Sequence, residues 1–260
     1  MGFKLTDIKL ILNTIDLYFD IDGQPKEGDV TKKSYELLKA QPSDIHDIFK
    51  KCNNLSFIEL GEEELKVLNQ ELNNALVQPF TVNPPRIWQK RKERMGYWAK
   101  DYLKTIFKNV ISTDVRCKCP KTLRVDLGRS LMAQNLTETF NILNNNGTTE
   151  HVGEFPLNRK TSTYNPQYYA FENIHNLVKT DGIIFHSVPF TDTKHGAFQY
   201  APKFFNSLAT ICNYDVIYNF TEARGDLVHT YCALVKKEDN KFIDLKTFEK
   251  IPGLSSLLGF

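Results

Sequence analysis

Three side chains that can move protons follow two apolar segments of this sequence. Glu150 and His151 come shortly after the apolar stretch 140–143 and a run of asparagines, and His195 lies in the polar loop after the apolar stretch 183–188. Carboxylates and imidazoles are the usual general acids and bases of enzymes. We therefore expect His151 or His195 to act as a base, with Glu150 orienting a histidine or contacting a substrate.

The same residues also have purely structural interpretations. Glu150 and His151 would then begin a helix or loop and hold its backbone. His186 lies inside the second apolar stretch, and we interpret it as a core or sheet-face histidine rather than a functional one. The remaining histidines are taken as ordinary: His46, His175 and His229.

An alternation of strands and helices would place these residues at one edge of a sheet. Strands are expected at 55–61, 109–114, 122–127, 140–143 and 183–188, and closing strands at 214–220 and 227–235. The alternation predicts an α/β fold with a doubly wound, mostly parallel sheet, and the short turn 221–226 predicts an antiparallel edge. Such sheets bind ligands where loops leave the carboxyl ends of the strands.

Helices are expected between the strands, from apolar residues spaced three and four apart. We predict helices at 62–76, 87–107 and 202–212, and one carrying Phe171, Ile174 and Leu177 that closes at 180–182. Before the first strand, 7–17, 32–40 and a segment capped by Ser43 and Asp44 also have helical patterns. The expected domains are a helical N-terminal extension (1–54), an α/β domain (55–237) and a C-terminal tail (238–260).

The composition limits the class of protein. The chain has 260 residues, 41% of them hydrophobic and 12% aromatic, which is enough for a substantial core. Its net charge of +2 does not indicate nucleic acid binding by bulk charge, although a local basic patch leaves that partner open. The sequence does not determine the oligomeric state.

The cysteines and apolar runs indicate a reducing, cytoplasmic setting. The five cysteines are scattered, no segment resembles a signal peptide, and no apolar run is long enough to span a membrane, so no membrane partner is expected. Cys117 and Cys119 resemble half of a thiolate metal site, but no second pair of cysteines or histidines accompanies them. We therefore expect ordinary thiols and no metal ion.

Three short motifs carry a resemblance to a known family. They are Asn-Asn-Gly-Thr-Thr-Glu-His-Val at 145–152, His-Ser-Val-Pro at 186–189 and His-Gly-Ala-Phe at 195–198. With the order of elements, they resemble the class I S-adenosylmethionine-dependent methyltransferases, in a bacterial-type branch with a Gly-Thr-Thr-Glu-His motif after the fourth strand. The resemblance covers about 55–235. It implies a Rossmann-like fold and transfer of a methyl group from S-adenosyl-L-methionine to oxygen or nitrogen of an unidentified small-molecule or glycan-like acceptor.

The resemblance also implies which residues hold the cofactor. Gly61 would let the methionine part pass close to the backbone, Asp114 would hold the ribose hydroxyls, Asp126 and Leu127 would contact the adenine, and Asn146 and Gly147 would lie beneath the reactive methyl group. The chain departs from the family at 62–64, three glutamates after Gly61, and at Asn141, where an acidic residue is common. These departures favour the alternative of a catalytically inactive protein with this fold that serves as a binding or scaffold protein.

Other interpretations also remain open from the sequence. The basic, aromatic segment 86–98 is either a lid or contact for an anionic acceptor, or a solvated helix face. The tyrosine-rich stretch 155–169 is either an acceptor-specificity loop or an insertion that packs. A glycan-modifying enzyme of another α/β type would need an Asp-x-Asp motif after a strand, which this sequence lacks.

Overall fold

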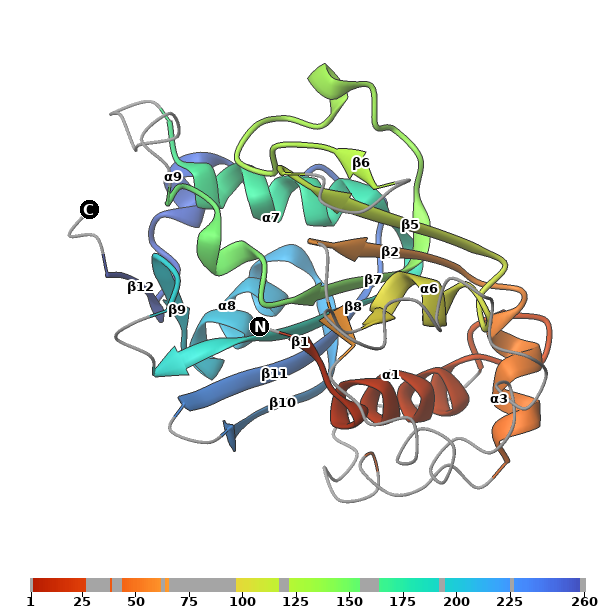
Figure 1. The fold of residues 1–260 in the computed structure, drawn as a ribbon. Helices are drawn as coiled ribbons and strands as arrows, with labels where there is room; N and C mark the ends of the chain where they lie inside the picture. The colour runs from red at the N-terminus through yellow and green to blue at the C-terminus, as the bar shows by residue number, and fades with distance from the viewer. Residues whose placement is uncertain are drawn as a thin grey trace.

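A seven-stranded sheet forms the centre of the computed structural model (Figure 1). The structure describes residues 2–26, 38, 44–61, 64–65, 97–116, 122–154, 164–191, 195–224 and 227–257. The strand order is β10-β11-β8-β7-β2-β5-β6. These strands are β2 (Ser56–Leu60), β5 (Asn109–Asp114), β6 (Leu123–Arg124), β7 (Phe140–Asn146), β8 (Val178–Thr191), β10 (Tyr214–Arg224) and β11 (Leu227–Lys236).

The predicted mixture of parallel and antiparallel pairing is confirmed. β7, β2, β5 and β6 pair in parallel in that order, and β7 also pairs in parallel with β8. β11 pairs antiparallel with both β8 and β10, which forms the antiparallel edge. This arrangement is the Rossmann-like methyltransferase fold that the sequence predicts.

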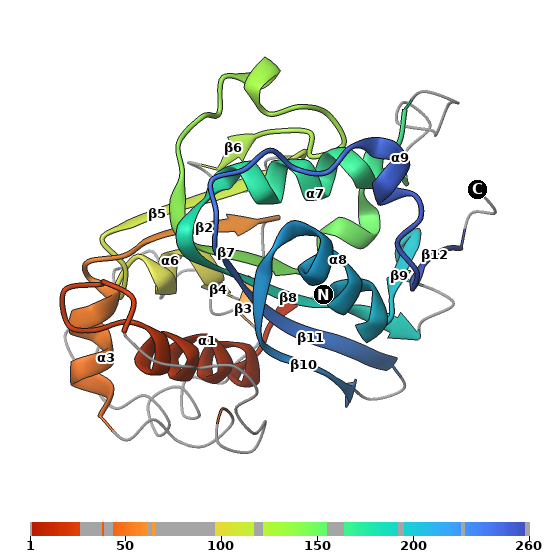
Figure 2. The ribbon, with the colours of Figure 1, turned by 180° about the vertical axis from the view of Figure 1, so that it is seen from behind.

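Helices cover both faces of the sheet (Figures 1 and 2). One side carries α1 (Leu5–Tyr18), α3 (Ile45–Cys52) and α6 (Ala99–Leu103), and the other carries α7 (Pro166–Leu177), α8 (Pro202–Cys212) and α9 (Leu245–Phe248). Two short 3₁₀ helices are η1 (Met132–Gln134) and η2 (Thr149–His151). The described residues also form two small sheets. One has the strand order β1 (Gly2–Phe3), β3 (Glu64–Leu65) and β4 (Tyr97–Trp98), and the other pairs β9 (Phe198–Tyr200) with β12 (Leu254–Ser256).

The N-terminal helices share a hydrophobic core with the sheet. Ile8, Ile11 and Ile15 of α1 pack in the same buried cluster as Phe57 of β2 and Ile142 of β7. Residues three and four apart lie on one face of a helix, and alternate residues of a strand lie on one face of the sheet. The apolar face of α1 therefore packs on the apolar face of the sheet. The domain boundary after residue 54 stays a prediction, but α1 is one of the layers that cover the sheet.

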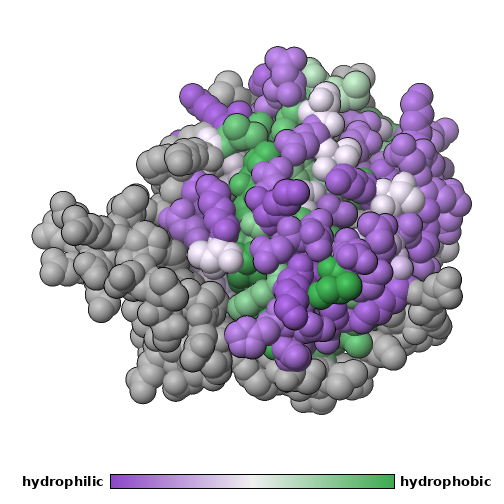
Figure 3. Space-filling view, turned by 90° about the vertical axis from the view of Figure 1, so that its right-hand side faces the viewer, coloured by the Kyte–Doolittle hydropathy of each residue, from purple (hydrophilic) through white to green (hydrophobic). Residues whose placement is uncertain are grey.

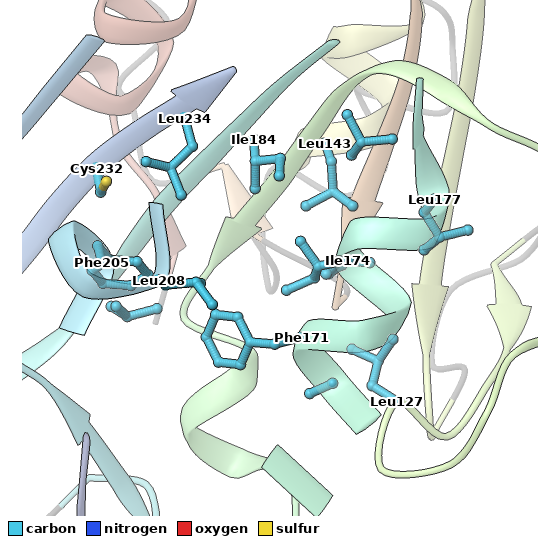
Figure 4. Packing of buried hydrophobic residues seen from close by; sticks show 14 of the residues in the cluster. Leu127, Leu143, Phe171, Ile174, Leu177, Ile184, Phe205, Leu208, Cys232 and Leu234 are labelled. Atoms are coloured by element: carbon cyan, nitrogen blue, oxygen red, sulfur yellow. The ribbon is translucent and has the colours of Figure 1, made fainter. Parts of the chain in front are cut away.

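The second core lies between the opposite face of the sheet and helices α7 and α8. Figure 4 shows Phe171 and Ile174 of α7 directed toward Leu143, Ile184 and Leu208. Asn165 caps α7 by accepting hydrogen bonds from the backbone amides of residues 167 and 168, and Pro166 occupies the first turn, where its missing N–H costs nothing.

Several predicted element boundaries are wrong. Residues 64–65 form strand β3 rather than part of a helix, because pairing with β1 and β4 overrides local helix propensity. Residues 97–98 likewise form strand β4, and within the described part of the helix expected at 87–107 the helical residues are those of α6. α7 ends at Leu177, and 178–182 already belong to β8, whose Val178 pairs with Phe140.

The tyrosine-rich stretch 155–169, expected to be a loop, ends in the first turn of α7. Tyr168 and Tyr169 lie in α7, since Asn165 and Pro166 start that helix. Residues 155–163 of the stretch lie outside the described residues. So do the basic residues 86–94, Cys117, Cys119, most of 62–76 and the helix expected at 32–40 except for Leu38.

The surface seen in Figure 3 is mainly hydrophilic where it is described, and its hydrophobic residues form small separate patches. Among the described helices, none is long and apolar enough to cross a membrane.

Candidate functional site

The strand order places the switch point of the sheet between β2 and β7, and sheets of this kind bind ligands at such a point. From β2 the chain moves to β5 and β6 on one side, and it then returns to β7 and β8 on the other. At such a point the loops that leave two neighbouring parallel strands diverge, and a crevice opens at the carboxyl ends of the strands. Gly61 follows β2 and Gly147 follows β7, so the structure brings these two predicted site residues to this point.

Thr148 packs directly over Gly61. Gly61 has φ +79°, and a Cβ at this position would overlap the hydroxyl group of Thr148, which donates a hydrogen bond to the carbonyl of Leu60. Only glycine combines this backbone conformation with so close a neighbour at no cost. The need for glycine thus has a local packing cause, and the close approach of a cofactor at Gly61 stays a prediction.

A double-mutant cycle at Gly61 and Thr148 tests this packing. We expect Gly61→Ala to lower the free energy of unfolding by roughly 1–3 kcal/mol, because backbone strain and the Thr148 overlap add. In the background of Thr148→Ala the overlap disappears and only the strain remains, so the cost of Gly61→Ala should fall. Urea unfolding of the four proteins measures this coupling. Equal costs in both backgrounds would contradict the contact.

Buried polar side chains line the α1 side of the crevice. Asn144 and Asn146 of β7 face this side because they lie two and four residues after Ile142, whose side chain packs there, and Ser187 of β8 is paired with Asn146. Nδ2 of Asn146 lies 3.5 Å from Oδ2 of Asp7, which α1 brings over the strand end. Asn144 Nδ2, Asn146 Oδ1 and Ser187 Oγ are buried and have no hydrogen-bond partner among the described residues.

These unsatisfied atoms are a signal for a ligand. A buried polar atom without a partner costs about 1–3 kcal/mol, so several such atoms at one strand end favour a ligand that supplies the missing bonds. The sequence analysis missed Asp7 and Ser187. Ser187 had a detectable signal, because it interrupts an apolar strand. Asp7 had none, because its place over β7 depends on how α1 docks.

Glu59 is a third residue that was not predicted from the sequence. It lies in β2, is 1% exposed, and accepts a hydrogen bond of 3.0 Å from the Ser112 hydroxyl on neighbouring β5. A glutamate inside an apolar strand is costly to bury and is the kind of departure that marks a functional or tightly paired position. Glu59 is paired with Asn144 in the sheet, so this carboxylate continues the buried polar row.

The residues predicted to hold ribose and adenine lie at the ends of adjacent strands. Asp114 ends β5, and its Oδ1 accepts a hydrogen bond of 2.5 Å from the backbone amide of Arg116. Asp126 follows β6 and accepts one of 2.9 Å from the amide of Gly128. Leu127 is buried, and its carbonyl accepts a hydrogen bond from Asn173 of α7. Their contacts with a cofactor stay predictions.

Glu150, His151 and His195 come together beyond the end of β7. The two Nε2 atoms of His151 and His195 are 3.1 Å apart, and Oε1 of Glu150 is 3.9 Å from the first and 3.8 Å from the second. Nδ1 of His151 lies 2.9 Å from a carboxylate oxygen of Glu154. The three predicted acid–base residues therefore form one cluster, although His195 is 44 positions from His151.

The backbone of this cluster is held from several sides. The Asn145 side chain accepts from the amide of Thr149 and donates to its hydroxyl, and Gln167 of α7 donates to the carbonyls of Thr149 and Val152. The amide of Ala197 donates to the carbonyl of Glu150 at 2.7 Å. The side chains of Asn145 and Gln167, rather than those of Glu150 and His151, hold the turn.

Burial changes the acidity of Glu150. Its side chain is fully buried, and this desolvation raises its pKa to about 7, while the neighbouring His151 acts in the opposite direction. Neither carboxylate oxygen has a hydrogen-bond partner among the residues that the structure describes. A carboxyl group that titrates near neutral pH suits general acid–base catalysis.

His186 is a core residue, as the sequence predicts. Its ring packs on Phe171 and Phe205, and Nδ2 of Asn145 donates to its Nδ1 at 2.9 Å, which leaves the proton on Nε2. Burial lowers the pKa of His186 to about 3, so the ring is neutral at physiological pH.

Comparison with known proteins finds similarity in fold alone. No protein-family model and no curated protein sequence matches the chain. The 1,6-didemethyltoxoflavin-N1-methyltransferase of Burkholderia thailandensis, solved with 1,6-didemethyltoxoflavin and S-adenosylhomocysteine, has a TM-score of 0.38 and 14% identity over 53% of this chain. This chain spans 65% of that enzyme, less than two thirds of its length.

Two further solved structures have TM-scores that equal or fall below that value. The N-methyltransferase NodS of Bradyrhizobium japonicum WM9, in complex with S-adenosylhomocysteine, has a TM-score of 0.38, 11% identity and coverage of 71% of this chain and 79% of that one. The sugar N-methyltransferase KedS8 of Streptoalloteichus sp ATCC 53650 has a TM-score of 0.26, 10% identity and coverage of 86% and 85%. The fold assignment rests on the strand order of the sheet.

Proposed function

We propose that the protein is an S-adenosylmethionine-dependent methyltransferase that acts on oxygen or nitrogen of a small-molecule or glycan-like acceptor. The observation that carries this proposal is the cluster of Glu150, His151 and His195 beside the crevice of a sheet with this strand order. The crevice accounts for a bound cofactor, and the cluster accounts for removal of a proton from the acceptor.

The donor set at the crevice fits the cofactor. Its amino acid part needs acceptors for an ammonium group and donors for a carboxylate, and the unsatisfied Asn146 Oδ1 and Asn144 Nδ2 offer one of each. Asp114, half-buried at the end of β5, offers a carboxylate that can accept from two ribose hydroxyls. Asp126 and Leu127 would contact the adenine.

The residues of this chain would position the acceptor and take its proton. The cofactor, when bound, supplies a methyl group already activated by the sulfonium, so alignment accounts for most of the rate enhancement. The imidazoles of His151 and His195 are about one third exposed and can be reached by an acceptor. Glu150 lies buried behind them, with its Oε1 3.9 and 3.8 Å from their Nε2 atoms, and the acceptor proton would pass to a histidine Nε2.

Calorimetry with S-adenosylhomocysteine tests the proposal directly. We expect one molecule to bind per chain. The titration should include a chelator, so that it reports on the cofactor crevice alone. An absence of heat at millimolar ligand, with a protein shown to be folded by circular dichroism, would reject the methyltransferase function.

Asp114→Ala should weaken that binding by roughly 10- to 150-fold, because a charge-assisted hydrogen bond contributes about 1.5–3 kcal/mol. Asp114→Asn should lose less, since it keeps an acceptor oxygen. Asp239→Ala removes a side chain that is 92% exposed, and it serves as the matched control with unchanged affinity. Equal affinities of Asp114→Ala and the wild type would overturn the ribose assignment.

One observation favours the alternative of an inactive binding or scaffold protein. The Thr148 hydroxyl fills the space over Gly61, where the methionine part of the cofactor is predicted to pass. If the wild type does not bind S-adenosylhomocysteine but Thr148→Ala does, the crevice is closed in the native protein, and the scaffold function is favoured.

A further inference from the structure

We propose that Glu150, His151 and His195 bind a divalent transition-metal ion. One ligand atom from each residue lies within 4.8 Å of the others. The sequence analysis assigned these residues to proton transfer and expected no metal ion. The spacing of the three atoms in the folded chain points to a second use of the same cluster.

The distances in the cluster match those of a metal site. Oε1 of Glu150 and the Nε2 atoms of His151 and His195 form a triangle with sides of 3.9, 3.8 and 3.1 Å. The point equidistant from its corners lies about 2.1 Å from each of the three atoms. Zinc–nitrogen and zinc–oxygen bonds in proteins are about 2.0–2.2 Å long. The distances therefore allow three bonds of metal–ligand length to meet at one point.

The tautomer of His151 is the one that a metal requires. Its Nδ1 lies 2.9 Å from Oε2 of Glu154, and a carboxylate only accepts, so Nδ1 carries the proton and the lone pair is on Nε2. Metal-bound histidines commonly donate their other N–H to a carboxylate, which fixes the ring and raises its basicity. Glu154 is thus a positioning residue for the proposed site.

Glu150 gives an independent reason to expect a cation. It is fully buried, and within the described part of the chain both of its oxygens lack a hydrogen-bond partner. The loop around Gly196 packs tightly against Glu150 and keeps its side chain buried. A Cβ on Gly196 would be only 2.7 Å from Cγ of Glu150, and the amide of Ala197 donates a hydrogen bond to the carbonyl of Glu150. A buried carboxylate held in this way is expected to pair with a positive charge.

The ligand set selects the class of ion. Two imidazoles and one carboxylate suit zinc, iron(II) or cobalt(II), whereas magnesium and calcium prefer oxygen ligands. Sites with three protein ligands leave a coordination position open for water or substrate. The partly exposed histidines place that position toward solvent. If the proposed function holds, the ion would contact the acceptor oxygen and lower the pKa of its hydroxyl group. Because both Nε2 lone pairs would then bind the ion, the proton would pass to water instead of to a histidine; this role alone rests on the proposed function.

Titration of the full chain with zinc chloride tests the site. The protein is first treated with a chelator, and binding is followed by calorimetry without any cofactor. We expect one zinc ion per chain, a visible absorption band with cobalt(II), and no binding of magnesium. Glu154→Gln should lower the zinc affinity by about 10- to 100-fold, and Glu150→Gln and His195→Ala should lower it further.

His46→Ala is the matched control, since His46 is exposed on α3, and its affinity should equal that of the wild type. If His195→Ala does not fold, as judged by circular dichroism, His195→Asn replaces it. Absence of binding to folded wild-type protein, or equal affinities of wild type and the ligand variants, would overturn the proposal. Because zinc is titrated without cofactor, and cofactor with a chelator present, failure of one proposal is distinguishable from failure of the other.

Discussion

Replacing Phe171 by alanine should lower the free energy of unfolding by about 3–5 kcal/mol, because it removes a large buried ring and leaves a cavity. Phe171 is 2% exposed on α7. Its ring centroid lies 5.0 Å from that of Phe204, 5.8 Å from that of Phe248 and 5.9 Å from that of Tyr200. Figure 4 shows its ring between α7 and Leu208 of α8. Rings held on several sides cannot collapse into the space.

Urea unfolding at neutral pH measures this effect. Phe171→Leu keeps much of the apolar volume and should cost less than Phe171→Ala. Met132→Ala is the surface control, because Met132 is 71% exposed, and its change should stay within about 0.5 kcal/mol. If Phe171→Ala is no more destabilising than Met132→Ala, the packing described for this core is wrong.

The second large effect is on acid stability and comes from His186. Its pKa falls from an ordinary value near 6.5 to about 3 in the folded protein, because burial disfavours the charged ring. The unfolded chain therefore binds this proton more readily. The contribution of the neutral ring to the free energy of unfolding is complete above pH 6.5. Below that pH it decreases by about 1.4 kcal/mol per pH unit, and the total loss at pH 3 is roughly 4–5 kcal/mol.

His186→Gln should remove this pH dependence. At pH 7 the variant is less stable than the wild type, because the ring contacts with Phe171 and Phe205 are lost. The difference should shrink as the pH is lowered from 6.5 to 4.5. Free energies of unfolding at several pH values measure the trend. His46→Gln, at an exposed position, should show no such convergence, and parallel curves for His186→Gln and wild type would contradict the assigned pKa.

Local patterns were sufficient for most of the sheet. The strands at 109–114 and 140–143, the helix at 202–212 and the antiparallel pair β10 and β11 follow from hydrophobic periodicity and turn residues. The structure extends the second of these strands to Asn146, into the asparagines that were expected to form a loop. Among the wrong predictions, those at 64–65 and 97–98 concern short segments that pair with strands distant in the sequence. Pairing of that kind has no local signal, because the hydrogen bonds that stabilise it come from other parts of the chain.

The sequence by itself determined that polar residues gather beyond β7 and β8, because the carboxyl ends of parallel strands meet at one edge. It also placed Gly61, Asp114 and Asn146 at that edge. Only the tertiary structure decided that Nε2 of His195 lies 3.1 Å from that of His151, with a buried Glu150 behind them. Loop conformations set this distance, and they depend on contacts such as Ala197 with Glu150 that no sequence spacing encodes.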